Sequence, residues 1–92
     1  VDKIAFTGET STGKEIIKAS TVNLKKVSME LGGKSPNVVF TDGDLDAALK
    51  GCMGSVFFNQ GQVCCAGTRL FVEKSIYDDF VGKLTDKVKK IS

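Results

Sequence analysis

Residues 36–61 of the chain read PNVVFTDGDLDAALKGCMGSVFFNQG, and this stretch holds the two patterns that decide the fold. Its first part, residues 37–40, is a short apolar run entered through a proline, which is typical of a strand. Its second part carries apolar side chains at helical spacing on one face: Leu45, Ala48, Leu49, Cys52, Met53, Val56 and Phe57. Asp42 or Asp44 can cap this helix, and Gly61 marks its expected end.

The same alternation of strands and helices continues on both sides of this stretch. Further strands are predicted at residues 4–7, 26–31 and 69–73, the first of them buried. Further helices are predicted at about residues 12–19 and from Ser75 onward. The resulting order, βαββαβα, predicts an α/β fold with mostly parallel sheets.

The first and last helices also carry predictable faces and caps. Ser75 and Asp78 resemble a capping box at the start of the last helix. The residues expected to face inward are Ile16 and Ile17 in the first helix, and Tyr77, Phe80, Val81, Leu84 and Val88 in the last. The stretch GGKSP at residues 32–36 is the best candidate for a domain boundary or hinge, and we divide the chain into residues 1–32 and 33–92.

The composition argues against several classes of protein. Thirteen basic and eleven acidic residues leave a net charge of +2 without clusters, so no nucleic-acid partner is expected. No apolar run approaches the roughly 18 residues of a membrane span, so no membrane partner is expected either. The chain contains no His, which excludes Ser-His-Asp and Cys-His catalysis within these residues and gives no reason to expect a metal site.

The cysteines and the first residues bear on the cellular context. Three cysteines, two of them adjacent, do not make a disulfide framework, so we expect reduced thiols and a cytoplasmic location. The chain begins at Val1 without Met or a signal-peptide pattern, and we expect it to be a segment of a longer protein.

Three short segments carry candidate chemistry, and the first is FTGETSTG at residues 6–13. A strand, a glycine-flanked turn and a helix start would direct backbone N–H groups and the helix dipole at an anion. The segment is neither G-x-G-x-x-G nor a P-loop, and an ordinary turn between a strand and a helix would have the same pattern.

The other two segments contain a carboxylate and a pair of thiols. Glu30, at a strand end beside two glycines, could reach into a cleft as a general base, although an exposed Glu paired with a Lys would look the same. Cys64 and Cys65 lie in a tight turn, NQGQVCCAG, whose N–H groups could stabilise a thiolate and a developing oxyanion. The alternative for these thiols is a buried packing role, which we expect for Cys52 on the central helix.

Together, and in this order, the three segments resemble the aldehyde dehydrogenase superfamily. FTGxTxxG is similar to its pyrophosphate-binding turn, MELGGKSPN to the segment with its general base, and FFNQGQVCCAGTR to its nucleophile segment. The resemblance covers essentially all 92 residues, whereas family chains are several times longer. It implies a partial segment of that fold, in which residues 1–32 end the nucleotide-binding domain and residues 33–92 begin the catalytic domain.

The resemblance implies an oxidoreductase that converts a small-molecule aldehyde to a carboxylic acid with NAD, NADP being left open. Cys64 would be the nucleophile, passing through a thiohemiacetal and a thioester, and Glu30 would activate the hydrolytic water. The oxyanion would be held by the Cys64 N–H and by an Asn outside this segment. Family members are commonly dimers or tetramers, so a homo-oligomer is expected.

The cofactor contacts implied by the resemblance are Gly8, Glu9, Thr10, Ser11, Thr12, Gly13, Leu31 and Gly32. Glu9 departs from the commonest pattern, in which a Ser stands at this position. A carboxylate there would repel the pyrophosphate unless it turns outward.

Two alternatives remain open. One is an acylating relative of the same superfamily, linked to CoA or phosphate. Such relatives often lack the base, so Glu30 argues for the hydrolytic reaction. The other is a non-enzymatic, structural use of the scaffold, against which the presence of both Cys64 and Glu30 argues.

Overall fold

A computed structural model describes residues 1–91, so that Ser92, the end of the predicted second part, lies outside the described residues. The chain forms two compact units, Val1–Gly33 and Lys34–Ser92, which we call the N-terminal and C-terminal units. The division follows Gly33 and therefore falls beside the predicted boundary. That these units end a nucleotide-binding domain and begin a catalytic domain stays a prediction.

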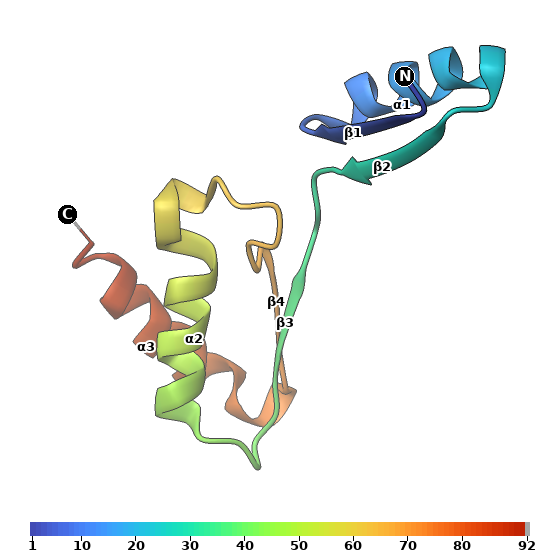
Figure 1. Cartoon of the computed structure of the whole chain (residues 1–92). Coiled ribbons are helices and arrows are strands. Elements are labelled where there is room, and N and C mark those ends of the chain that lie inside the picture. Colours follow the sequence, from blue (N-terminus) through green and yellow to red (C-terminus); the bar gives the residue numbers. More distant parts are fainter. Residues whose placement is uncertain (92) are drawn as a thin grey trace. The chain divides into compact units, whose positions relative to one another are not determined.

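The N-terminal unit is one strand–helix–strand crossover (Figure 1). It contains β1 (Lys3–Thr7), α1 (Thr10–Ser20), a 3₁₀ turn (Thr21–Asn23) and β2 (Lys26–Glu30). The two strands are parallel, with Lys3 opposite Lys26 and Thr7 opposite Glu30. A buried β1 was expected, but its residues alternate between exposed and half-buried, because this pair of strands is covered by a single helix.

Helix α1 begins at Thr10, earlier than predicted, because Glu9 caps it. Gly13 and Ser20 are buried and Ile16 is half-buried, and these positions form one narrow stripe at helical spacing. Ile17 lies beside that stripe and is 42% exposed, so the expectation that it faces inward is wrong.

The C-terminal unit repeats the crossover and adds a last helix. It contains β3 (Pro36–Val39), α2 (Leu45–Phe57), β4 (Arg69–Val72) and α3 (Tyr77–Val88), with 3₁₀ turns at Phe58–Gly61 and Lys74–Ile76. The strands β3 and β4 are parallel, with Pro36 opposite Arg69 and Val39 opposite Val72. Helices α2 and α3 pack against each other beside this pair (Figure 1). The predicted order βαββαβα and the parallel pairing are confirmed.

The core of the C-terminal unit joins one strand to both helices. Its buried members are Val39, Leu49, Cys52 and Phe80, of which Leu49 and Phe80 are only 1% exposed. The predicted face of α2 is confirmed except at its end, where Phe57 is 42% exposed. No helix within residues 1–91 combines the length and apolar character needed to cross a membrane.

Of the predicted caps of α2 and α3, the structure confirms only the first. Asp44 caps α2 by accepting a 3.0 Å hydrogen bond from the Ala47 N–H, as predicted. The predicted capping box of α3 is wrong, because the Ser75 hydroxyl donates instead to the Glu73 carboxylate, at 2.9 Å, and a 3₁₀ turn precedes the helix. Tyr77 was expected to face inward but is 51% exposed, whereas Phe80 is buried as predicted.

Candidate active site

The turn between β1 and α1 is tied to the end of β2 within the N-terminal unit. The Gly8 N–H donates to the Glu30 carbonyl at 3.0 Å. A Cβ at Gly13 would lie 2.8 Å from Leu31 Cδ2, so a larger residue there would force the Leu31 side chain to shift. Gly32 lies against the same helix start, with the Thr10 hydroxyl 4.0 Å from where its Cβ would be. The unit therefore brings together the turn, Glu30 and the residues after it.

The Glu9 side chain occupies the N-terminus of α1. Its carboxylate accepts hydrogen bonds from the Ser11 N–H at 2.6 Å, from the Thr12 N–H at 3.3 Å and from the Ser11 hydroxyl. The Ser11 hydroxyl is the main cause, ahead of the Ser11 N–H, of a Glu9 pKa below its ordinary value. The carboxylate thus folds onto the helix start. Glu is not a preferred N-cap residue, so the sequence carried no clear signal for this contact.

Glu30, the predicted base, is the last residue of β2 and is exposed within its unit. It stands opposite Thr7 in the strand register, so it lies at the same end of the pair as the turn that follows β1. The carboxyl ends of parallel strands are the usual edge for ligands in open α/β sheets.

The predicted nucleophile lies in the C-terminal unit, at the tip of a β-turn. The Ala66 N–H donates to the Val63 carbonyl at 3.0 Å, which makes Cys64 and Cys65 the two central residues of the turn. Both are free thiols and both are exposed, so a buried packing role does not describe them. Ala66, at the base of the turn, is only 3% exposed.

Cys52 behaves differently from this pair. It is 7% exposed within the core of the C-terminal unit, and burial raises the pKa of its thiol. A raised pKa reduces the fraction of thiolate, the reactive form. The packing role predicted for Cys52 therefore agrees with its surroundings.

A left-handed segment, which the sequence did not predict, leads from α2 into the Val63–Ala66 turn. Asn59, Gln60 and Gly61 have φ of 49°, 60° and 75°. The left-handed conformation costs roughly 1–2 kcal/mol for a residue with a side chain, so it must be enforced by its surroundings. Asn59 provides part of that constraint, since its carbonyl accepts from the Gln62 N–H at 3.1 Å and its side chain donates to the Gln62 carbonyl at 3.2 Å. Helix α2 ends at Phe57, before the predicted Gly61, because the left-handed residues that follow cannot continue a right-handed helix.

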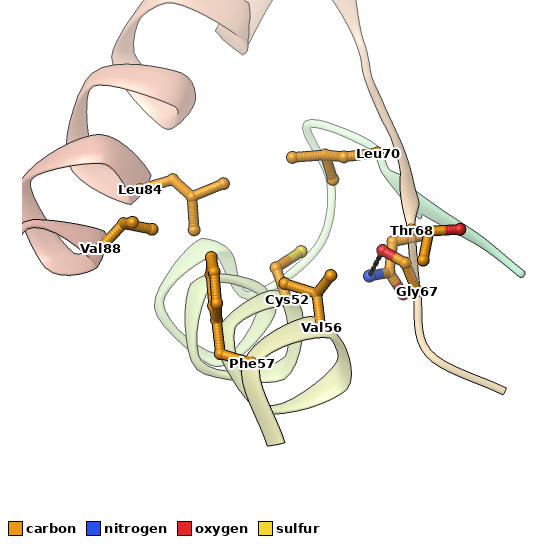
Figure 2. Close-up of a pocket in the computed structure, with 9 residues that line it drawn as sticks. Cys52, Val56, Phe57, Gly67, Thr68, Leu70, Leu84 and Val88 are labelled. Atoms are coloured by element: carbon orange, nitrogen blue, oxygen red, sulfur yellow. Dashed lines mark hydrogen bonds between the residues drawn. The ribbon is translucent and has the colours of Figure 1, made fainter. Parts of the chain in front are cut away.

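The chain beyond the turn borders an apolar cavity of about 170 Å³ (Figure 2). Gly67 and Thr68 form one side of it. The other side is formed by α2 and α3, through Val56, Phe57, Leu84 and Val88. The segment that follows the two thiols therefore forms part of the wall of this cavity.

The two predicted catalytic residues lie in different units, Glu30 in the first and Cys64 in the second. Among residues 1–91, no group of three or more His, Cys, Asp or Glu side chains could hold a metal ion.

Comparisons with known proteins give matches along essentially the whole chain. The model of the aldehyde dehydrogenase family matches residues 1–92. An aldehyde dehydrogenase of Davidiella tassiana is 55% identical over 91 residues, and retinal dehydrogenase 2 of Homo sapiens is also 55% identical over 91 residues. In both cases the match covers 98% of this chain and 18% of the relative, so the chain spans less than a fifth of their length.

Solved structures also match the chain along essentially its whole length. The structure of betaine aldehyde dehydrogenase from Staphylococcus aureus in complex with NAD+ superposes with a TM-score of 0.97 at 44% identity, over 100% of this chain and 18% of that one. The structure of PnpE in complex with nicotinamide adenine dinucleotide superposes with a TM-score of 0.93 at 48% identity, over 99% of this chain and 19% of that one. The agreement of sequence and fold over all three candidate segments shows that the chain belongs to the aldehyde dehydrogenase family.

Proposed function

We propose that this chain supplies the nucleophile and the general base of an NAD-dependent oxidation of an aldehyde to a carboxylic acid. The observation that carries the proposal is the placement of Cys64, which is exposed at the tip of a turn whose base is buried. A nucleophile needs such a position, accessible to substrate but held by its surroundings. The activity would belong to the full-length enzyme that contains these residues.

The start of α1 fits the phosphates of a dinucleotide. The Ser11 N–H, the Ser11 hydroxyl and the Thr12 N–H already bind an anion, the carboxylate of Glu9, so the donors suit an anionic oxygen. We propose that Gly8, Thr10, Gly13, Leu31 and Gly32 complete this site. NAD+, when bound, supplies the acceptor for the hydride, and NADP+ would do the same chemistry.

In the proposed reaction the Cys64 thiolate attacks the aldehyde carbon, forming a C–S bond and an oxyanion. Within residues 1–91 the Cys64 N–H takes part in no hydrogen bond, which leaves it available to that oxyanion. Loss of a hydride from the thiohemiacetal gives a thioester. Glu30 takes a proton from a water molecule, whose oxygen then attacks the thioester, releasing the carboxylic acid and the Cys64 thiolate.

The remaining assignments concern the full-length enzyme. We propose a small-molecule aldehyde as substrate, because two of the relatives are named for such compounds, retinal and betaine aldehyde. A homo-oligomer and a cytoplasmic location also stay predictions. The expectation of a reducing compartment rests on the odd number of cysteines, two of which are adjacent.

The decisive experiment compares two adjacent substitutions in the full-length chain. Cys64→Ala should abolish NAD-dependent aldehyde oxidation, whereas Cys65→Ala should leave much of it, because only Cys64 is the proposed nucleophile. Both thiols are exposed on the same turn, so each variant is a matched control for the other. Activity in Cys64→Ala together with loss in Cys65→Ala would reassign the nucleophile.

A further inference from the structure

Three residues anchor the chain just beyond the proposed nucleophile. The Asn37 carboxamide, on β3, donates to the Ser55 hydroxyl at 2.7 Å and to the Gly67 carbonyl at 3.4 Å. Ser55, on α2, accepts from the Gly67 N–H through its own carbonyl at 3.1 Å, while its hydroxyl donates to the Cys52 carbonyl at 3.0 Å. Both backbone polar groups of Gly67 are therefore bonded to other elements; Figure 2 shows the bond to its carbonyl. We call Asn37, Ser55 and Gly67 the Gly67 anchor.

The anchor requires glycine for a steric reason. A Cβ at residue 67 would lie 2.3 Å from the Asn37 Nδ2 and 2.7 Å from the Ser55 Oγ, which is too close for any side chain. Gly67 is buried, and its neighbour Ala66 is 3% exposed. The chain is thus tightly held at this point, in contrast to the exposed thiols before it.

The anchor is connected to Cys64 through an unbroken set of backbone bonds. The Ala66 N–H closes the nucleophile turn on Val63, at 3.0 Å, and the Ala66 carbonyl accepts from the Thr68 N–H at 2.8 Å. Ala66 therefore belongs to the turn and also to the segment that the anchor holds. A shift of Gly67 would be transmitted to the base of the turn and so to the position of Cys64.

We propose that Asn37 is a positioning residue, which fixes the Cys64 thiolate through Ser55 and Gly67 without touching the substrate. The inference rests on the proposed function, because it matters only if Cys64 is the nucleophile. Attack requires the sulfur and the carbonyl carbon to meet in aligned geometry, and a misplacement of about 1 Å can cost roughly 10²-fold in rate. Asn37 is suited to this task because it is half-buried and has two donors in a fixed plane.

The test uses Asn37→Asp in the full-length chain, because Asp keeps the shape but loses the two N–H donors. We expect kcat to fall about 10- to 100-fold, while the KM for the aldehyde changes by less than about threefold. Ser55→Ala keeps the backbone bonds of Gly67 and should cost about three- to tenfold in kcat. The double variant should be no slower than Asn37→Asp alone, because both changes break one network.

The matched control is Val39→Ala, on the same strand as Asn37. Val39 is 7% exposed and belongs to the core, so truncation should lower the thermal unfolding midpoint. It should nevertheless leave kcat within about twofold of wild type well below that midpoint, because Val39 is not part of the Gly67 anchor.

The outcomes separate the anchor from the proposed function. A kcat for Asn37→Asp within about twofold of wild type, with Cys64→Ala inactive, would overturn the anchor and leave the nucleophile intact. An equal loss in Val39→Ala would also overturn it, since stability alone would then explain the effect. If Asn37→Asp does not fold, Ser55→Ala carries the same test. Activity in Cys64→Ala would overturn the proposed function instead. Even in that case, hydrogen exchange at the Gly67 amide can test the anchor. Slow exchange in wild type and faster exchange in Asn37→Asp would show that Asn37 holds Gly67 in place.

Discussion

The carboxylate of Glu9 accepts a 2.6 Å hydrogen bond from the backbone N–H of Ser11, and so a side chain of the protein occupies the anion-binding end of α1. The N–H groups at a helix start attract phosphate for the same reason that they attract this carboxylate. Bound pyrophosphate would have to share these donors with Glu9 or displace it. The residue that caps the helix is therefore also a competitor of the proposed cofactor.

The first prediction concerns this competition. In the full-length chain, Glu9→Ser should leave NAD+ affinity unchanged or raise it by up to about fivefold, because Ser still caps the helix but brings no negative charge. Calorimetric titration with NAD+ measures the effect. The control is Glu15→Ser, which removes the same charge from an exposed ion pair with Lys18 away from the helix start. Weaker binding in Glu9→Ser alone would show that Glu9 makes a contact the cofactor needs.

The second prediction separates the two steps assigned to Cys64 and Glu30. Glu30→Gln in the full-length chain should slow hydrolysis of the thioester more than its formation, since loss of a general base costs about 10²–10⁴-fold. Rapid mixing with NAD+ and an aldehyde should then show a burst of NADH followed by slow turnover. An unchanged steady-state rate across the neutral pH range would remove Glu30 from the mechanism. Faster turnover on adding CoA would favour the acylating alternative.

Sequence patterns predicted the elements well where packing repeats along the chain. The face of α2 that holds Leu49 and Cys52 follows a 3.6-residue period, and the structure buries it. The same reasoning failed at Ile17 and Tyr77, which are apolar or aromatic but lie at the edge of a helix face that the unit does not cover. Periodicity identifies a face but not its width, which depends on what packs against it.

The features that hold the Val63–Ala66 turn could not be predicted from periodicity. Asn37 meets Ser55 and Gly67 across 18 and 30 residues of sequence, and no local pattern connects them. The left-handed conformation of Gln60 likewise contradicts its own preference and follows from the surrounding bonds. Turns and tertiary hydrogen bonds of this kind concentrate at functional sites, where local preference is a poor guide.

The third prediction uses the carboxylate of Glu73. It accepts from the Thr41 N–H and from the Ser75 hydroxyl, both at 2.9 Å, and these bonds, the first above all, lower the pKa of Glu73 from its ordinary value of 4.5. A pKa that is lower in the folded than in the unfolded state stabilises the fold above the unfolded pKa, and this contribution is lost as the pH falls through the folded value.

Glu73→Gln in the full-length chain should therefore lower the thermal unfolding midpoint near neutral pH and flatten its decline below about pH 4.5. Ser75→Ala, which removes one of the two donors, should give an intermediate result. Unfolding curves recorded by circular dichroism between neutral pH and about pH 3 provide the measurement. Parallel curves for wild type and Glu73→Gln would show that these bonds do not contribute to stability.

The last prediction concerns residues 1–92 alone, which should neither bind NAD+ tightly nor oxidise aldehydes. Within residues 1–91 each unit contains only a two-stranded sheet, whereas a dinucleotide needs the crevice of a fuller sheet. Large apolar side chains are left in contact with water: Leu24 is 87% exposed, Phe58 72% and Phe40 61%. Such surfaces and open strand edges favour self-association. The purified segment should elute from size exclusion as more than a monomer, give no heat with NAD+ at micromolar concentrations and show no turnover. Micromolar binding, or turnover that Cys64→Ala removes, would mean that the two units suffice to build the site, and the exposed side chains would then need another explanation.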